Sequence, residues 1–123
     1  MKDTVLVVDD DPMIQMAVRR ILESEGLKVT TVDDGKACIR EVEKGFEGLI
    51  LMDIMMPGMN GWDTIQTLVD KSEVKGNILC MLTGDEKPDD RMKLYKEVVL
   101  DYIRKPFDPK GLVRLVKEYL AYL

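Results

Sequence analysis

The stretch TVLVVDDDP at residues 4–12 sets a run of apolar residues directly against three aspartates. Residues 5–8 are typical of a β-strand that is buried on both faces, as the strands of parallel sheets are. Three adjacent carboxylates beside an apolar core repel one another, so this strand end requires something that compensates their charge. Asp11 followed by Pro12 is typical of the N-cap and first residue of a helix, and we expect Asp11 to face away from any chemistry.

The alternation of apolar runs with amphipathic segments continues along the whole chain. Further strands are expected at residues 28–32, 49–52, 77–82 and 100–103. Helices are expected between the strands and after the last of them, including a fourth helix that Pro88 opens near residues 91–97. Five buried strands that alternate with helices predict a three-layer α/β domain built on a parallel sheet.

Composition narrows the class of protein and the class of partner. The 123 residues, 46% of them hydrophobic and 33% charged, describe one globular domain over residues 1–123. The net charge of −5 argues against nucleic-acid binding by this domain, because phosphate contacts need clustered Lys and Arg. No apolar run is long enough to cross a bilayer and no signal peptide opens the chain, so we expect a cytoplasmic protein without membrane contact.

The residues that are rare or missing exclude several kinds of site. The chain contains no histidine, which removes histidine-based catalysis, most zinc sites and any role as a phosphohistidine donor. Cys38 and Cys80 lie among apolar residues without a CxxC spacing, and we expect both to be buried thiols. Asp89 and Asp90 are interpreted as the solvated start of a helix.

Polar side chains follow the predicted strands at the point where each strand ends. Asp9 and Asp10 end the first strand, and Asp53 ends the third. Thr83 ends the fourth strand and Lys105 follows the fifth. Because the carboxyl ends of parallel strands meet at one edge of a sheet, we expect these five side chains to converge there.

Three carboxylates at one edge favour a divalent cation with hard oxygen ligands, first Mg²⁺ and otherwise Mn²⁺ or Ca²⁺. Such an ion offsets the repulsion among the aspartates. The Lys105 ammonium and the Thr83 hydroxyl suit an anion beside the metal, as in a phosphoryl clamp. A carboxylate can itself form an aspartyl phosphate, and Asp53 is the candidate because it ends the central strand of the group.

Four stretches of the sequence resemble the receiver domain of two-component response regulators. They are VLVVDDDP at 5–12, LILMDIMMPGMNG at 49–61, MLTG at 81–84 and DYIRKPF at 101–107, in that order along the chain. The resemblance implies a flavodoxin-like (βα)5 sandwich whose strand order is 2-1-3-4-5. It also implies a phosphorylation-dependent signalling switch, which catalyses only its own phosphorylation and dephosphorylation and is no enzyme with a separate substrate.

The resemblance further implies a role for each residue around the acceptor. Asp53 would be the phosphoacceptor, and Asp10 would bind Mg²⁺ directly with help from Asp9. The main-chain carbonyl of Met55 would be a further metal ligand. With Asp53 itself, these residues make up the expected metal site.

The remaining site residues would contact the phosphoryl group or respond to it. Lys105 would contact the phosphoryl oxygens, and Thr83 would shift to hydrogen-bond them. Gly84 would complete the phosphoryl-binding set as a small residue that leaves access to the acceptor. Tyr102 would turn inward when Thr83 moves, and Pro106 would form a structural turn through a cis peptide bond.

The resemblance also implies partners and an output surface. A sensor histidine kinase or a histidine phosphotransfer protein would supply the phosphoryl group, and an unidentified downstream protein or effector domain would read the change. The output surface would be the fourth helix, the fifth strand and the fifth helix of a monomer or weak dimer. Residues 96–101 depart from the family, which usually has a turn rich in Gly and Ala there, and this puts the usual geometry of that face in question.

Two other classes of protein share parts of this pattern. Phosphatases of the haloacid-dehalogenase type also form an aspartyl phosphate, but they need a second acid where Met55 stands, and a cap domain. Flavodoxin-like modules bind FMN at the same edge of the sheet, where three aspartates would repel the FMN phosphate.

Overall fold

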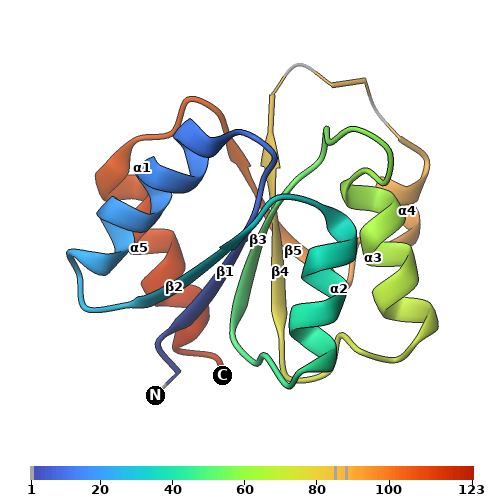
Figure 1. The fold of residues 1–123 in the computed structure, drawn as a ribbon, viewed down its shortest axis with the longest axis horizontal. Helices are drawn as coiled ribbons and strands as arrows, with labels where there is room; N and C mark the ends of the chain where they lie inside the picture. Colours follow the sequence, from blue (N-terminus) through green and yellow to red (C-terminus); the bar gives the residue numbers. More distant parts are fainter. Residues whose placement is uncertain (1, 85, 88) are drawn as a thin grey trace.

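Five parallel strands form the middle layer of the computed structural model, which describes residues 2–84, 86–87 and 89–123 (Figure 1). The sheet has the order β2-β1-β3-β4-β5, and each neighbouring pair is parallel. The predicted strand order is thereby confirmed. The strands are β1 (Thr4–Val8), β2 (Lys28–Val32), β3 (Leu49–Asp53), β4 (Ile78–Thr83) and β5 (Val99–Arg104).

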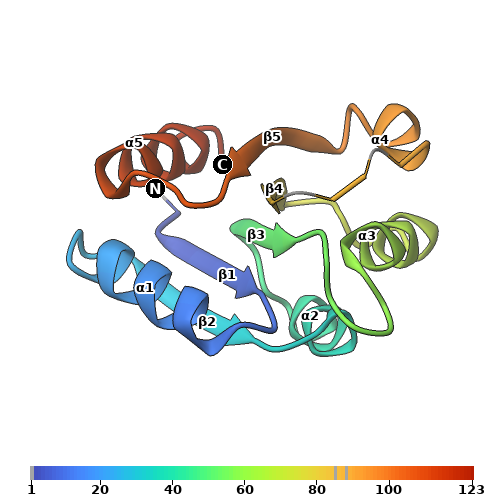
Figure 2. The same cartoon turned by 90° about the horizontal axis from the view of Figure 1, so that it is seen from above.

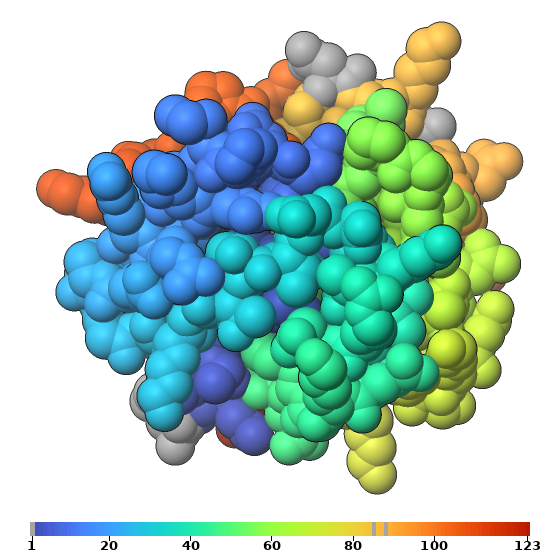
Figure 3. All heavy atoms as spheres, in the orientation of Figure 1, coloured from blue at the N-terminus to red at the C-terminus, as the bar shows by residue number. Residues whose placement is uncertain are grey.

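Helices cover both faces of this sheet. In the described part of the chain they are α1 (Pro12–Glu23), α2 (Gly35–Glu43), α3 (Gly61–Asp70), α4 (Arg91–Leu94) and α5 (Pro109–Leu120). The view along the sheet shows α1 and α5 on one face and α2, α3 and α4 on the other (Figure 2). In the space-filling view, atoms of α1, β2 and α2 lie side by side across this face of the molecule (Figure 3). None of the helices among the described residues is long and apolar enough to cross a bilayer.

Alternating side chains of the strands build two apolar cores. Leu6 and Val8 of β1 contribute to the core beneath α2 and α3, whereas Val5 and Val7 contribute to the core beneath α1 and α5. All four side chains are fully buried, which explains why this strand reads as an uninterrupted apolar run. The apolar stretch that opens the sequence therefore stabilises both halves of the domain.

The two cysteines belong to these cores, one to each. Cys38 of α2 and Cys80 of β4 are buried free thiols, as predicted. Burial raises the pKa of each thiol to about 12, so both stay protonated at neutral pH. They therefore act as small apolar side chains.

An aspartate fixes the start of α1 and the turn that precedes it. The Asp11 carboxylate accepts a hydrogen bond from the backbone N–H of Met13 at 2.9 Å, and Pro12 occupies the first helical position. The predicted cap is confirmed. Because only Asp9 and Asp10 separate this cap from β1, the turn holds both carboxylates at the carboxyl end of the strand.

The segment between β4 and β5 differs from its prediction. The predicted helix near residues 91–97 ends at Leu94 and gives way to turns over residues 95–98, and Pro88 lies outside the described residues. Val98 and Val99 both donate backbone hydrogen bonds to the Tyr95 carbonyl, at 2.9 and 3.0 Å, which closes this turn. Two adjacent β-branched residues favour a strand over a helix, so β5 begins one residue earlier than predicted.

A β-bulge determines which face of the sheet each side chain of β5 lies on. Leu79 of β4 pairs with Val99, but its neighbour Cys80 pairs with Asp101, so Leu100 is left out of the ladder. The extra residue lets Val99 and Tyr102 contact the same core although they are three positions apart. The bulky residues 96–101 are therefore accommodated by a turn and a bulge.

Gly61 lies where α3 meets the end of β3. A Cβ atom at this position would lie 2.6 Å from the carbonyl oxygen of Asp53 and 3.0 Å from the Cα of Ile54. Both neighbours are backbone atoms, which cannot turn aside as a flexible side chain can. The absence of a side chain at Gly61 thus allows α3 to approach the strand end that carries Asp53.

We predict that Gly61→Ala lowers the free energy of unfolding by about 1–3 kcal/mol, because the added methyl group must displace backbone. Gly111→Ala is the control, since the nearest atom to its Cβ is a side-chain oxygen of Asp108 at 3.3 Å. Alanine also favours helix over glycine there. Urea unfolding of both variants checks the prediction, and an equal loss of stability in the two would contradict it.

Candidate functional site

An acidic cavity of about 460 Å³ lies at the carboxyl ends of the strands. The loops that follow β1, β3, β4 and β5 all leave the sheet at this edge, which is the top edge in Figure 1. The cavity is lined by Asp9, Asp10, Asp11, Asp53, Met55, Gly84, Glu86 and Lys105. The structure thus brings together residues from four separate strand ends.

Asp9 is fully buried, and both of its carboxylate oxygens have partners. One oxygen accepts a hydrogen bond from the backbone N–H of Asp11 at 2.9 Å. The other lies 2.9 Å from the Lys105 ammonium. A buried carboxylate is costly unless it is paired and hydrogen-bonded, and Asp9 meets both conditions.

Asp53 ends β3 and is 4% exposed. One carboxylate oxygen lies 3.1 Å from the Lys105 ammonium and accepts a longer hydrogen bond, of 3.3 Å, from the Met55 N–H. Burial raises the pKa of Asp53 to about 6, the charge of Asp9 adds to this, and Lys105 opposes part of it. Burial and the neighbouring Asp9 therefore disfavour the charged form of Asp53 inside this cavity.

Lys105 joins the two buried carboxylates. Its backbone N–H donates to the Thr83 carbonyl at 2.7 Å, which fixes the residue at the edge of β4, and its peptide bond to Pro106 is cis. Burial lowers the pKa of Lys105, but its hydrogen bonds and ion pairs with Asp9 and Asp53 outweigh burial and raise the pKa overall. The ammonium therefore stays charged between the aspartates.

The donor set fits a small hard cation. Asp9, Asp10 and Asp53 each offer an oxygen, and these atoms lie within 4.8 Å of one another. Asp10 is exposed to solvent, so its carboxylate can gain a ligand without breaking a core contact. Met55 lines the same cavity. Carboxylates with access to water are the ligands that Mg²⁺ prefers.

Thr83 and Tyr102 are neighbours on adjacent strands at the side of this cavity. Thr83 pairs with Arg104 and Met81 pairs with Tyr102, so Thr83 and Tyr102 lie diagonally on the same face of the sheet. Both side chains are partly buried, and burial raises the pKa of Tyr102. Thr83 is not among the described residues that line the cavity, whereas Gly84, which follows it, is.

Sequence reasoning missed two features of the cavity. Asp11 was expected to face away from the chemistry, but it lines the cavity while it caps α1, because the tight turn after β1 brings the cap close to Asp9. Glu86 was not singled out, yet it lines the cavity and accepts a hydrogen bond from Gly84. Its place three residues after the fourth strand, at the functional edge, was the signal available.

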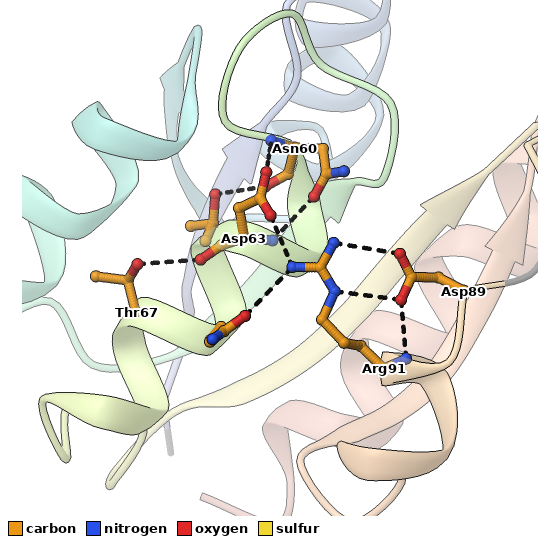
Figure 4. A network of polar contacts seen from close by, with 7 residues as sticks. Asn60, Asp63, Thr67, Asp89 and Arg91 are labelled. Atoms are coloured by element: carbon orange, nitrogen blue, oxygen red, sulfur yellow. Dashed lines mark hydrogen bonds and ion pairs between the residues drawn. The ribbon is translucent and has the colours of Figure 1, made fainter.

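An arginine fixes the start of the short helix α4 (Figure 4). The Arg91 guanidinium donates to the Asp63 carboxylate at 2.7 Å and to both oxygens of Asp89 at 3.2 Å. It thereby ties α4 to the first turn of α3. Asp63 also completes a capping box with Asn60, at 2.9 and 3.0 Å. The loop that carries Gly84 and Glu86 is therefore anchored where it enters α4.

The hydrogen bonds from Arg91 lower the pKa of Asp63 and of Asp89 below the ordinary carboxyl value. The Asp89 side chain is 30% exposed and the Asp90 side chain is exposed, so both reach solvent at the start of α4. The Arg91 guanidinium donates to both carboxylate oxygens of Asp89. Sequence spacing showed no partner for Arg91 on α3.

We predict that Asp53→Asn stabilises the protein at pH 7 in the presence of a metal chelator. A carboxyl whose pKa rises from 3.8 to about 6 on folding costs the folded state free energy that grows as pH rises from about 4 towards 6. The neutral amide removes this cost of about 1–3 kcal/mol, in which the opposing effect of Lys105 is already included. The gain should shrink as pH falls from about 6 towards 4, and it vanishes only well below pH 3.8, where the wild-type carboxyl is protonated in both states.

Urea unfolding across pH 4 to 7 measures this difference. Asp90→Asn is the control, because Asp90 is exposed and makes no capping hydrogen bond in α4. A metal-free Asp53→Asn variant less stable than wild type at pH 7 would show that the ion pair with Lys105 outweighs the cost of burial.

Comparisons with known proteins agree with this geometry. The sequence model of the family described as response regulator receiver domain matches residues 5–117. The DNA-binding response regulator MtrA of Mycolicibacterium smegmatis is 35% identical over 120 residues, which cover 98% of this chain and 51% of MtrA. An uncharacterized 14.6 kDa protein from the sodA1 3′ region of Leptolyngbya boryana is 33% identical and covers 94% of this chain and 88% of that protein. This chain spans about half the length of the MtrA relatives that it matches.

Solved structures give the same result. A CheY-like response regulator receiver domain protein from Methanospirillum hungatei JF-1 superposes with a TM-score of 0.92 at 42% identity, covering 97% of this chain and 94% of that one. The chemotaxis protein CheY4 of Vibrio cholerae gives 0.82 at 27% identity, covering 96% and 98%. Receiver domains are signalling switches of two-component systems and bind Mg²⁺ at an acidic pocket. The chain belongs to the receiver-domain family of response regulators.

Proposed function

We propose that this receiver domain is switched by transfer of a phosphoryl group to Asp53. The observation that carries the proposal is the position of Asp53, buried at the end of β3 with one oxygen 3.1 Å from the Lys105 ammonium. A carboxylate in a cavity beside a fixed cation is placed to attack phosphorus and to have the developing charge stabilised. The neighbouring acidic residues give the same cavity its affinity for a divalent cation.

The phosphoryl donor is a phosphohistidine outside this chain, which contains no histidine. An oxygen of Asp53 forms a bond to phosphorus while the bond from phosphorus to the imidazole nitrogen breaks, and the electron pair stays on that nitrogen. Lys105 holds the phosphoryl oxygens, together with the Thr83 hydroxyl and the Gly84 N–H. The donor protein is a sensor histidine kinase or a histidine phosphotransfer protein, and water later hydrolyses the acyl phosphate.

Asp9, Asp10 and Asp53 would hold Mg²⁺, with the main-chain carbonyl of Met55 as a further ligand. Their oxygens lie within 4.8 Å of one another, and Asp10 is open to solvent. Bound Mg²⁺ would offset the charge of the carboxylates and of the phosphoryl oxygens. A phosphatase of the haloacid-dehalogenase type would need an acidic residue at the position of Met55. The methionine there therefore favours a receiver domain over such a phosphatase.

Thr83 and Tyr102 would transmit the change to the surface formed by α4, β5 and α5. Their diagonal placement on one face of the sheet supports this, because a shift of the Thr83 hydroxyl towards the phosphoryl group frees space beside the Tyr102 ring. A downstream protein or effector domain would read that surface. We expect the domain to be a monomer or a weak dimer. We also expect that it binds no nucleic acid itself.

Incubation with acetyl phosphate and Mg²⁺ should add one phosphoryl group to the wild-type protein, as read by intact mass. Asp53→Asn should gain none, since an amide cannot act as the acceptor, and a chelator should abolish labelling of wild type. Asp10→Ala should raise the Mg²⁺ concentration needed for half-maximal labelling by about tenfold or more, because it removes a charged ligand. Equal labelling of wild type and Asp53→Asn would contradict the proposal.

The switch has a separate test. Tyr102→Ala should label at Asp53 as wild type does but lose most of the phosphorylation-dependent change in amide hydrogen exchange over α4 and β5. Tyr122→Ala is the matched control, because that ring is 71% exposed near the chain end. If Tyr102→Ala keeps the full change in exchange, Tyr102 has no part in the switch.

A further inference from the structure

The amide that follows Thr83 is already bound to a carboxylate. The Gly84 N–H donates to Oε2 of Glu86 at 2.7 Å, a short distance for a hydrogen bond from nitrogen to oxygen. Gly84 and Glu86 both line the cavity that contains Asp53 and Lys105. The amide is therefore directed at an anionic oxygen at the very edge where a phosphoryl group on Asp53 would lie.

We infer that Glu86 is an intramolecular competitor for the phosphoryl-binding amide of Gly84, and that it thereby slows the gain of a phosphoryl group by Asp53. The inference rests on the proposed function, in which this amide receives a phosphoryl oxygen. The amide serves one anionic oxygen at a time in a linear hydrogen bond, so the Glu86 carboxylate must leave before a phosphoryl oxygen binds.

The charges of the cavity strengthen this competition. Lys105 is already engaged by Asp9 and Asp53, at 2.9 and 3.1 Å. The other described side chains with a formal charge around the cavity are acidic: Asp10, Asp11 and Glu86. An incoming phosphoryl dianion thus meets the Glu86 carboxylate both as an occupant of its hydrogen-bond donor and as a like charge.

The competition predicts an asymmetry between phosphorylation and dephosphorylation. With acetyl phosphate, an oxygen of Asp53 bonds to phosphorus, the bond from phosphorus to the acetyl oxygen breaks, and acetate leaves with the electron pair. Glu86 holds the amide before this step and has been displaced after it. During hydrolysis the phosphoryl group occupies the amide both in the ground state and in the transition state, so removal of Glu86 changes that rate little.

Three variants test the inference with acetyl phosphate and Mg²⁺. Glu86→Ala should raise the rate constant of phosphoryl gain by about three- to tenfold, the range expected for loss of one charge-assisted hydrogen bond at a partly buried site. Glu86→Gln keeps an acceptor but removes the charge, and its rate should lie between those of wild type and Glu86→Ala. Glu97→Ala is the control. It removes the same kind of side chain and the same charge, but from an exposed position in the turn before β5.

Intact mass followed over time gives the rate of gain, and removal of the donor gives the rate of loss. The inference is supported by faster gain in Glu86→Ala with a rate of loss close to that of wild type. It is overturned if Glu86→Ala gains the phosphoryl group no faster than Glu97→Ala, or more slowly, as simple loosening of the loop would cause. A Glu86→Gln rate equal to that of Glu86→Ala would also overturn it. The negative charge of Glu86 alone, and not its hydrogen bond with the Gly84 N–H, would then account for the slower gain.

The result for the proposed function is separate. If neither wild type nor any Glu86 variant gains a phosphoryl group at Asp53, the proposed function fails and this inference fails with it. If all proteins are labelled in a manner that depends on Asp53 and Mg²⁺ but at equal rates, only the competition by Glu86 is refuted.

Discussion

The concentration of negative charge at one edge of the sheet is the constraint on which the rest of the structure depends. Asp9 and Asp53 are both buried, and the Lys105 ammonium lies within 2.9 and 3.1 Å of their oxygens. Removal of Lys105 would leave both buried carboxylates without a cation. The arrangement therefore demands that β1, β3 and the segment after β5 stay in fixed register, and two apolar cores, one on each face of the sheet, supply that rigidity.

The same constraint leaves the negative charge at this edge only partly compensated. A salt bridge within a folded core could neutralise one aspartate with one lysine, but here one lysine serves two carboxylates and Asp53 keeps a pKa of about 6. The excess negative charge remains unsatisfied in the protein itself, which favours an external cation. Among the described residues that line the cavity, acidic side chains therefore outnumber the one lysine.

Much of this could be predicted from the sequence, for identifiable reasons. The strands that end in Asp9 and Asp53 are uninterrupted apolar runs, and parallel pairing brings their carboxyl ends together, so the acidic cluster follows from pattern and topology. The end of α4 could not be predicted, because helical spacing up to Glu97 competes with the preference of Val98 and Val99 for a strand. Glu86 and the Arg91 contacts escaped because loop residues have no periodicity, and their partners are fixed by tertiary placement.

The bulge at Leu100 also bears on how this domain tolerates change in length. Because one residue of β5 is excluded from the ladder, the register of the strand is reset between the turn at 95–98 and the residues that reach the site. A change of length in that turn can be absorbed by altering which residue bulges, without reversing the faces on which Tyr102 and Ile103 lie. The bulge thus sets which core each later residue of β5 contacts: Tyr102 packs against the core beneath α2 and α3, and Ile103 belongs to the core beneath α1 and α5.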